Sequence, residues 1–145
     1  MKSVIQRVKQ AELTVDGELI SRIGRGLVVF FGVGKGDQEA SCAQMAKKIA
    51  NMRIFEDENG KMNLSVKDVG GEILFVSQFT LYGDTSHGNR PSFTMAEAPD
   101  RANELYQRAA MELRSLGVPV KEGVFGADMK ISQLNDGPVT IIHEI

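Results

Sequence analysis

The spacing of apolar residues divides the chain into strand-like and helix-like stretches. Apolar and β-branched residues gather in eight short segments, a pattern that predicts strands. These segments are residues 3–8, 11–15, 18–23, 27–33, 72–81, 118–125, 129–134 and 139–145. Asp16-Gly17 joins the second segment to the third, and this dipeptide suits a type I′ hairpin turn. The fourth segment is a continuous apolar run, and it and the fifth segment are predicted to be strands buried within the molecule.

Two longer stretches carry apolar residues at helical spacing. The first covers about residues 38–54, and Asp37 is predicted to cap its N-terminus. The second is predicted to begin at Pro99, because proline suits the first turn of a helix. Gly117 and Pro119 are predicted to end this second helix.

The segments between these elements are mostly polar. Residues 57–60 predict a turn, and residues 61–71 an irregular surface segment. Residues 82–98 form a connection longer than usual, and loops of that length are often functional. Two helices among seven or eight strands predict a single α+β domain over residues 1–145, without internal repeats or linkers.

Composition narrows the class of protein. The 145 residues are 42% hydrophobic and 25% charged, as in soluble globular proteins. The single cysteine, Cys42, excludes an intrachain disulfide and favours a reducing compartment. No stretch has the length of a membrane span or the apolar core of a signal peptide, so we expect a cytoplasmic protein. The net charge of −2 argues against nonspecific coating of nucleic acid, although a local patch that grips one end of an RNA stays open.

Few residues of the conventional catalytic kinds are present. His87 lies in the long loop, where exposure and chemistry both stay open, and His143 lies in the last predicted strand, where a structural role is expected. Cys42 falls on the apolar face of the first predicted helix and is expected to pack as a small hydrophobic side chain. No spacing fits a metal site, and the glycine run at 32–36 fits no phosphate or dinucleotide motif. We therefore expect neither a metal nor a cofactor.

Two segments remain as candidates for chemistry. Residues 77–84, Ser-Gln-Phe-Thr-Leu-Tyr-Gly-Asp, place polar side chains where a buried strand opens into the long loop. Buried polar groups cost stability unless they are bonded, so these groups either bond nearby backbone or form a site. Residues 135–140, Asn-Asp-Gly-Pro-Val-Thr, are either a turn before the last strand or a functional segment. The proline allows a cis peptide bond.

At these residues the sequence resembles the D-aminoacyl-tRNA deacylase family. Residues 77–82 and 135–140 look like the two signature motifs of that family. Three further stretches agree in order and spacing: Val-Ile-Gln-Arg-Val at 4–8, Arg-Pro-Ser-Phe at 90–93 and Phe-Gly-Ala-Asp-Met at 125–129. The similarity covers essentially the whole chain and shows no departure at the signature positions.

The resemblance implies a homodimer of a barrel-like fold, with mostly antiparallel β-sheets and two main helices. It implies a tRNA-editing hydrolase that cleaves the ester between a D-amino acid and the terminal adenosine of tRNA. Mischarged glycine is implied as a second substrate. The expected partners are therefore the aminoacylated 3′ end of tRNA and a second copy of the chain, with no membrane and no DNA.

The resemblance also implies which residues form the site. The Gly137-Pro138 bond would be cis and would reach into the pocket of the other subunit. It would lie there beside the candidate catalytic residues Ser77, Gln78, Phe79 and Thr80. Backbone carbonyl oxygens of such a turn can accept hydrogen bonds from the substrate's α-ammonium, which leaves a D side chain facing solvent and drives an L side chain into protein. Glycine has no side chain to reject.

Two accounts of the hydrolytic step stay open. Thr80 is a candidate nucleophile, but a hydroxyl needs an adjacent base and no histidine is an obvious partner. In the account we favour, the neighbouring ribose hydroxyl of the tRNA positions the water, while the N–H groups of Phe79 and Thr80 stabilise the oxyanion. Two other functions remain as alternatives: a non-catalytic RNA-binding module, and an esterase that acts on small D-amino-acid esters or peptides.

Overall fold

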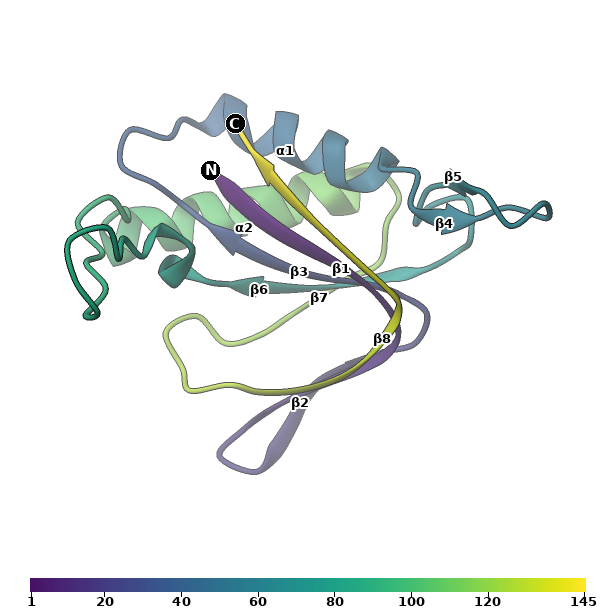
Figure 1. The fold of residues 1–145 in the computed structure, drawn as a ribbon, viewed down its shortest axis with the longest axis horizontal. Helices are drawn as coiled ribbons and strands as arrows, with labels where there is room; N and C mark the ends of the chain where they lie inside the picture. Colours follow the sequence, from purple (N-terminus) through teal and green to yellow (C-terminus); the bar gives the residue numbers. More distant parts are fainter.

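Strand β1 (Lys2–Val15) lies in the middle of the sheet, and the other elements are arranged around it (Figure 1). The computed structural model describes residues 1–145. The other strands are β2 (Glu18–Ile23), β3 (Gly26–Gly32), β4 (Phe55–Glu56), β5 (Met62–Leu64), β6 (Glu72–Ser77), β7 (Val120–Glu122) and β8 (Lys130–Glu144). The helices are α1 (Glu39–Asn51), the short 3-10 helix η1 (Phe79–Tyr82) and α2 (Pro99–Ser115).

The sheet has six strands in a mixed arrangement. Strand β1 pairs antiparallel with β3 along its first half, with β2 along its second half, and with β8 along nearly its whole length. Strands β6 and β7 extend the sheet beyond β3 in parallel. The sheet curls into a nearly closed, barrel-like shape, with the β2 hairpin folded away from the helices (Figure 1). Strands β4 and β5 form a separate small hairpin.

Helices α1 and α2 lie on one face of the sheet, and the core divides into two clusters (Figure 1). The larger cluster lies between the helices and the sheet and includes Ile5 and Val29. The smaller cluster lies within the curl of the sheet and includes Val28 and Leu74. The neighbours Val28 and Val29 are each 0% exposed although they point to opposite faces. This confirms that the apolar run at 27–33 forms a strand covered on both sides.

Several predicted elements are confirmed. Asp16 and Gly17 both have positive φ, 50° and 79°, as a type I′ turn requires. Helix α2 begins at Pro99, and Gly117 adopts a φ of 84° just beyond its end. Eight strands and two α-helices in one domain agree with the predicted α+β class. Neither α-helix combines the length and the apolar character that a membrane span needs.

Residues 135–140 do not form a turn before the last strand, which was one of the two alternatives left open for them. The predicted strands at 129–134 and 139–145 are parts of the single 15-residue strand β8. Because Gln6 pairs with Thr140 and Val8 pairs with Asn135, four residues of β8 stand opposite the single residue Arg7. Residues 136–139 therefore form a large bulge within a continuous strand.

Four further boundaries were predicted wrongly, and one of them is the strand at 118–125, of which only Val120–Glu122 forms β7. The segments at 3–8 and 11–15 form one strand, β1, because its pairing with β8 continues past the irregularities. Strand β6 ends at Ser77 rather than at 81, and η1 follows. The segment at 61–71 contains the short strand β5.

Asp37 does not cap α1, which corrects another prediction. The N-cap position is Gln38, and it makes no side-chain capping bond. The Asp37 carboxylate instead accepts hydrogen bonds from the N–H of Gly34 and from the ammonium of Met1. Its short-range partner is thus the turn before the helix rather than the helix itself.

Candidate active site

The polar segment predicted at 77–84 begins where β6 leaves the sheet. Ser77 is the last residue of β6 and pairs in register with Phe31 of β3. The N–H of Gln78 still donates to the carbonyl of Phe31 at 2.8 Å, and the chain then turns into η1. Within η1, the N–H of Leu81 donates to the carbonyl of Gln78 at 3.3 Å. The N–H groups of Phe79 and Thr80 come before this first closed turn, where a helix has no internal acceptors for them.

A cavity of about 650 Å³ opens beside this segment. Eleven of its 17 lining residues are hydrophobic, and three of the rings are those of Phe79, Phe93 and Phe125. Phe79 is 56% exposed and meets Phe93 edge to face, with ring centroids 5.1 Å apart. Apolar cavities of this size with a few polar groups are typical of small-molecule sites.

Ser77, Gln78 and Phe79 line this cavity, whereas Thr80 lies just beside it. The Thr80 side chain is exposed, and its Oγ1 accepts a hydrogen bond from the side-chain amide of Gln78. An amide is not a base, so Thr80 has no proton acceptor in this arrangement. The remaining polar groups of the wall are Glu97 and Asp128.

Within one chain, Gly137 and Pro138 do not line the cavity. Their peptide bond is cis, as the resemblance implied, and Gly137 has a φ of 127°. Both residues are exposed and lie in the bulge of β8. The structure therefore brings together the candidate residues of the first motif but not those of the second.

The buried side chain of Arg7 supports this bulge through a hydrogen bond, a contact that the sequence analysis missed. This side chain is 6% exposed, donates from Nη1 to the carbonyl of Ile54 at 2.7 Å, and donates from Nε to the carbonyl of Asp136 at 3.0 Å. A Cβ added to Gly137 would lie 3.0 Å from Arg7 Nη2, which shows how closely the two residues pack. The available signal was a charged residue next to Val8 in a segment predicted to be a strand, since arginine is seldom buried without partners.

Neither histidine lines the cavity, and Cys42 does not line it either. His87 is exposed, with its Nδ1 2.7 Å from the Ser86 hydroxyl. His143 lies in β8, and its backbone carbonyl accepts a hydrogen bond from Ser3. Cys42 is fully buried between the helices, and burial raises the pKa of its thiol to about 11. A thiol with that pKa stays protonated at neutral pH and is a poor nucleophile.

The sequence of this chain has close relatives among known proteins. The family model described as D-Tyr-tRNA(Tyr) deacylase matches residues 4–144. A D-aminoacyl-tRNA deacylase of Desulfitobacterium hafniense is 58% identical over 142 residues, which are 98% of this chain and 95% of that protein. The D-aminoacyl-tRNA deacylase of Carboxydothermus hydrogenoformans is 54% identical over 145 residues, the full length of both chains.

Two solved structures share the fold of this chain. A protein titled c-Myc DNA Unwinding Element Binding Protein superposes with a TM-score of 0.95 at 45% identity, covering 100% of this chain and 99% of the other. A probable eukaryotic D-amino acid tRNA deacylase shares the fold at 20% identity, with a TM-score of 0.86 and coverage of 99% and 98%. Matches of this extent place the chain among the hydrolases that cleave ester bonds. It belongs to the D-Tyr-tRNA(Tyr) deacylase family, whose model leaves out only residues 1–3 and 145.

Proposed function

We propose that this chain is a cytoplasmic editing enzyme that hydrolyses the ester between a D-amino acid, or mischarged glycine, and the terminal adenosine of tRNA. The observation that carries the proposal is the cavity at the end of β6, which Ser77, Gln78 and Phe79 help to line in a chain that matches a deacylase family. The family match supports ester chemistry on aminoacyl-tRNA, and the geometry of the cavity supports the finer assignments that follow.

The cavity suits a terminal nucleoside of an RNA strand. Phe79, Phe93 and Phe125 offer ring faces and edges to a flat base, and base–aromatic contacts are a common mode of binding single-stranded RNA. The volume of about 650 Å³ leaves room for the aminoacyl group beside Ser77 and Gln78. The net charge of −2 fits recognition of one RNA end better than binding along a duplex.

The complete site requires a homodimer in this proposal. Gly137 and Pro138 lie outside the cavity of their own chain, on a bulge that projects from the sheet. Strand β8 pairs with β1 alone, and two of its side chains, Leu134 and Ile142, are 51% and 74% exposed. A long unpaired edge with exposed apolar side chains favours association. A second copy packed on β8 would carry Gly137-Pro138 into the cavity of its partner.

Selection of the D configuration follows from backbone atoms in this arrangement. Carbonyl oxygens near Gly137 would accept hydrogen bonds from the substrate's α-ammonium, while the carbonyl carbon of the ester lies beside η1. With the ammonium and the ester carbon fixed, the side chain on Cα points one way in a D-amino acid and another way in an L-amino acid. A D side chain would point to solvent, and an L side chain would collide with protein. Glycine would be cleaved, because it has no side chain to exclude.

The hydrolytic step needs no protein nucleophile in this proposal. Thr80 is bonded by an amide and has no base, which argues against covalent catalysis by its hydroxyl. The ribose hydroxyl beside the ester would position the attacking water, and the N–H groups of Phe79 and Thr80 would stabilise the oxyanion. Positioning and oxyanion stabilisation are each large contributions to catalysis in other hydrolases.

The test is incubation of the purified protein with D-tyrosyl-tRNA and measurement of the D-tyrosine released. We expect catalytic release, and an intact ester with bound tRNA would instead establish a non-catalytic RNA-binding module. A second comparison uses a D-aminoacyl adenosine and an analogue that lacks the neighbouring ribose hydroxyl. Equal hydrolysis of the two would contradict assistance by the ribose and favour an esterase for small D-amino-acid esters.

A further inference from the structure

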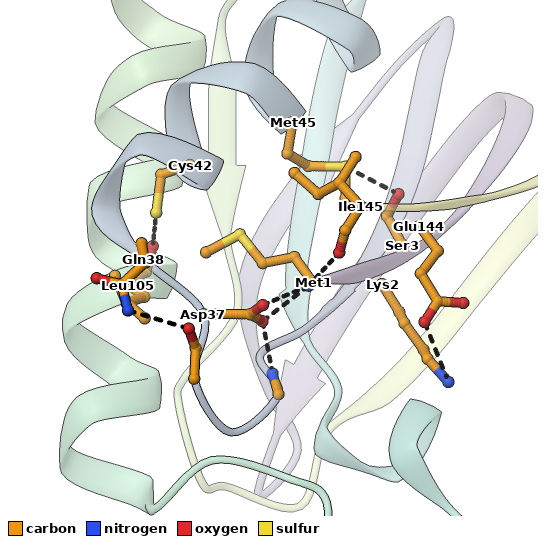
Figure 2. Close-up of polar contacts among 12 residues, drawn as sticks. Met1, Lys2, Ser3, Asp37, Gln38, Cys42, Met45, Leu105, Glu144 and Ile145 are labelled. Atoms are coloured by element: carbon orange, nitrogen blue, oxygen red, sulfur yellow. Dashed lines mark hydrogen bonds and ion pairs between the residues drawn. The ribbon is translucent and has the colours of Figure 1, made fainter.

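The Met1 ammonium is held between the Asp37 carboxylate and the last residue of the chain. Asp37 Oδ1 accepts a hydrogen bond from the Met1 ammonium at 2.8 Å, and Asp37 Oδ2 lies 2.8 Å from the same nitrogen. The ammonium also donates to the backbone oxygen of Ile145 at 3.0 Å. Met1 is 1% exposed, so this ion pair is shielded from water. Figure 2 shows Met1 between Asp37 and Ile145.

The same carboxylate fixes the turn between β3 and α1. Asp37 Oδ2 accepts a hydrogen bond from the N–H of Gly34 at 2.7 Å, and the Asp37 N–H donates back to the Gly34 carbonyl at 3.2 Å. This turn holds one wall of the cavity, because the Glu97 N–H donates to the Val33 carbonyl at 3.0 Å. A shift of the turn would therefore move the cavity wall.

The turn also contacts η1, because it packs against Tyr82, the last residue of that helix. The Tyr82 ring occupies the space beside Gly34, where an added Cβ would lie 2.6 Å from ring atoms. The Lys2 ammonium also lies over this ring, 4.8 Å from its centroid. Burial, together with the charge of Asp37, raises the pKa of the Tyr82 phenol, so the ring stays neutral in this contact.

We propose that Asp37 is a positioning residue for deacylation, which it supports by tying the turn at 33–37 to the Met1 ammonium. Through Tyr82 the turn sets the position of η1, and through Val33 it sets the wall at Glu97. The proposal rests on the proposed function, in which the Phe79 and Thr80 N–H groups of η1 stabilise the oxyanion. A small displacement of these donors would slow the chemical step more than it would weaken substrate binding.

The Met1 amine offers a way to break this contact without altering Asp37. A residue added before Met1 converts the ammonium into a neutral amide and removes the ion pair. The added residue must also be accommodated at a site that is 1% exposed. An engineered Gly-Ser extension before Met1 and the substitution Asp37→Asn should therefore have the same effect.

The kinetic test compares Asp37→Asn, Asp37→Glu and the extended protein with the unaltered chain, below the unfolding temperature of each. On D-tyrosyl-tRNA we expect Asp37→Asn and the extension to lower kcat by about tenfold or more, with KM changed by less than about threefold. Asp37→Glu keeps the charge and should restore part of kcat. The matched control is Glu39→Gln, because Glu39 is the next acid along the chain and its side chain is 62% exposed.

A spectroscopic test reports the position of η1 without any activity measurement. The chain has two tyrosines, so 3-fluorotyrosine labelling gives two fluorine NMR signals. We expect the Tyr82 signal to shift in Asp37→Asn and in the extended protein. The Tyr106 signal should stay in place, because Tyr106 is buried in the core and donates to the Phe75 carbonyl at 2.7 Å. An unchanged Tyr106 signal also shows that the variant is folded.

The possible results separate three cases: Asp37 positions η1, Asp37 does not position it, or the proposed function itself is wrong. An unchanged kcat in a folded Asp37→Asn protein, or a Tyr82 signal that does not move, would overturn the inference. If Asp37→Asn fails to fold, the extension and Asp37→Glu carry the same test. If the unaltered protein leaves D-tyrosyl-tRNA intact, the proposed function fails, and the Tyr82 signal still decides whether Asp37 positions η1.

Discussion

At the scale of single residues, the Thr80 hydroxyl is bonded by the Gln78 amide rather than by a base. A threonine nucleophile without a base is weak at neutral pH. We therefore expect Thr80→Ala to keep the rate of the chemical step on D-tyrosyl-tRNA within about tenfold of the unaltered protein, since its backbone N–H is retained. The measurement is single-turnover hydrolysis at saturating enzyme.

The control for this variant is His87→Ala, because His87 is exposed and does not line the cavity. It should leave the chemical step unchanged. If Thr80→Ala binds substrate normally but hydrolysis disappears, the Thr80 hydroxyl takes part in the reaction, and assistance by the ribose becomes the weaker account.

Arg7 is the other residue with a clear expected effect. Arg7→Met would leave the carbonyls of Ile54 and Asp136 without their donor in a buried place. Losing such partners costs about 1–3 kcal/mol of the free energy of unfolding. We also expect a loss of deacylation, because the bulge with Gly137 loses its support. Urea denaturation and hydrolysis rates measure the two effects.

Arg22→Met is the matched control for Arg7. Arg22 also pairs with an acid, at 2.7 Å from Glu12, but its side chain is 63% exposed. Exposed ion pairs contribute little, so the free energy of unfolding should change by less than about 0.5 kcal/mol. Equal effects of the two substitutions would show that Arg7 has no special role beneath the bulge.

At the scale of elements, the features that were predicted correctly are those that a short stretch of sequence determines. The hairpin at Asp16-Gly17 and the start of α2 at Pro99 depend on backbone preferences of single residues, and both were predicted correctly. The continuity of β8 depends instead on its partner β1, which pairs with it on both sides of the bulge. Gly137-Pro138 resembles a turn locally, so no local pattern could distinguish the bulge from a turn.

The candidate site was also predicted only where it depends on local sequence. Polar residues after a buried apolar run pointed to Ser77 and Gln78, and the cavity lies beside them. The cavity wall at 96–99 and the support by Arg7 depend on contacts between distant segments. Asp37 was misassigned as a helix cap for the same reason, because its partner Met1 lies 36 positions away.

Strand β8 also carries the prediction about assembly. If its exposed face forms the contact between two copies, Ile142→Glu should convert the dimer to a monomer, since it buries an unpaired charge in that contact. We expect deacylation to fall at least about tenfold, because a shared site is incomplete in one copy. Light scattering and hydrolysis rates on the same samples measure both.

Met111→Glu is the control for assembly. Met111 is an apolar residue 61% exposed on α2, on the helical side of the sheet, so its replacement should leave the dimer and the activity unchanged. A monomeric Ile142→Glu protein with full activity at nanomolar concentration would contradict a site shared between subunits.

At the scale of the whole molecule, the proposed site joins two surfaces that one chain keeps apart. The cavity beside η1 would hold the adenosine and the ester, and the bulge of a second copy would hold the α-ammonium. Selectivity in such a site depends on backbone atoms and not on a pocket for the side chain. Bulky and small D-aminoacyl-tRNAs should therefore be cleaved at broadly similar rates.

The sharpest test of this arrangement compares D-alanyl-, L-alanyl- and glycyl-tRNA on one tRNA body. An ordinary apolar pocket distinguishes one methyl group by about 1–3 kcal/mol, or roughly 10- to 200-fold. Rigid exclusion by backbone should reject L-alanine more strongly than that, because its methyl group would enter occupied space. Glycine should be cleaved at a rate similar to that of D-alanine, since neither places a group against the excluding surface. Slow cleavage of glycine beside fast cleavage of D-alanine would mean that the enzyme binds the D side chain itself, and steric exclusion near Gly137 would then no longer explain the selectivity.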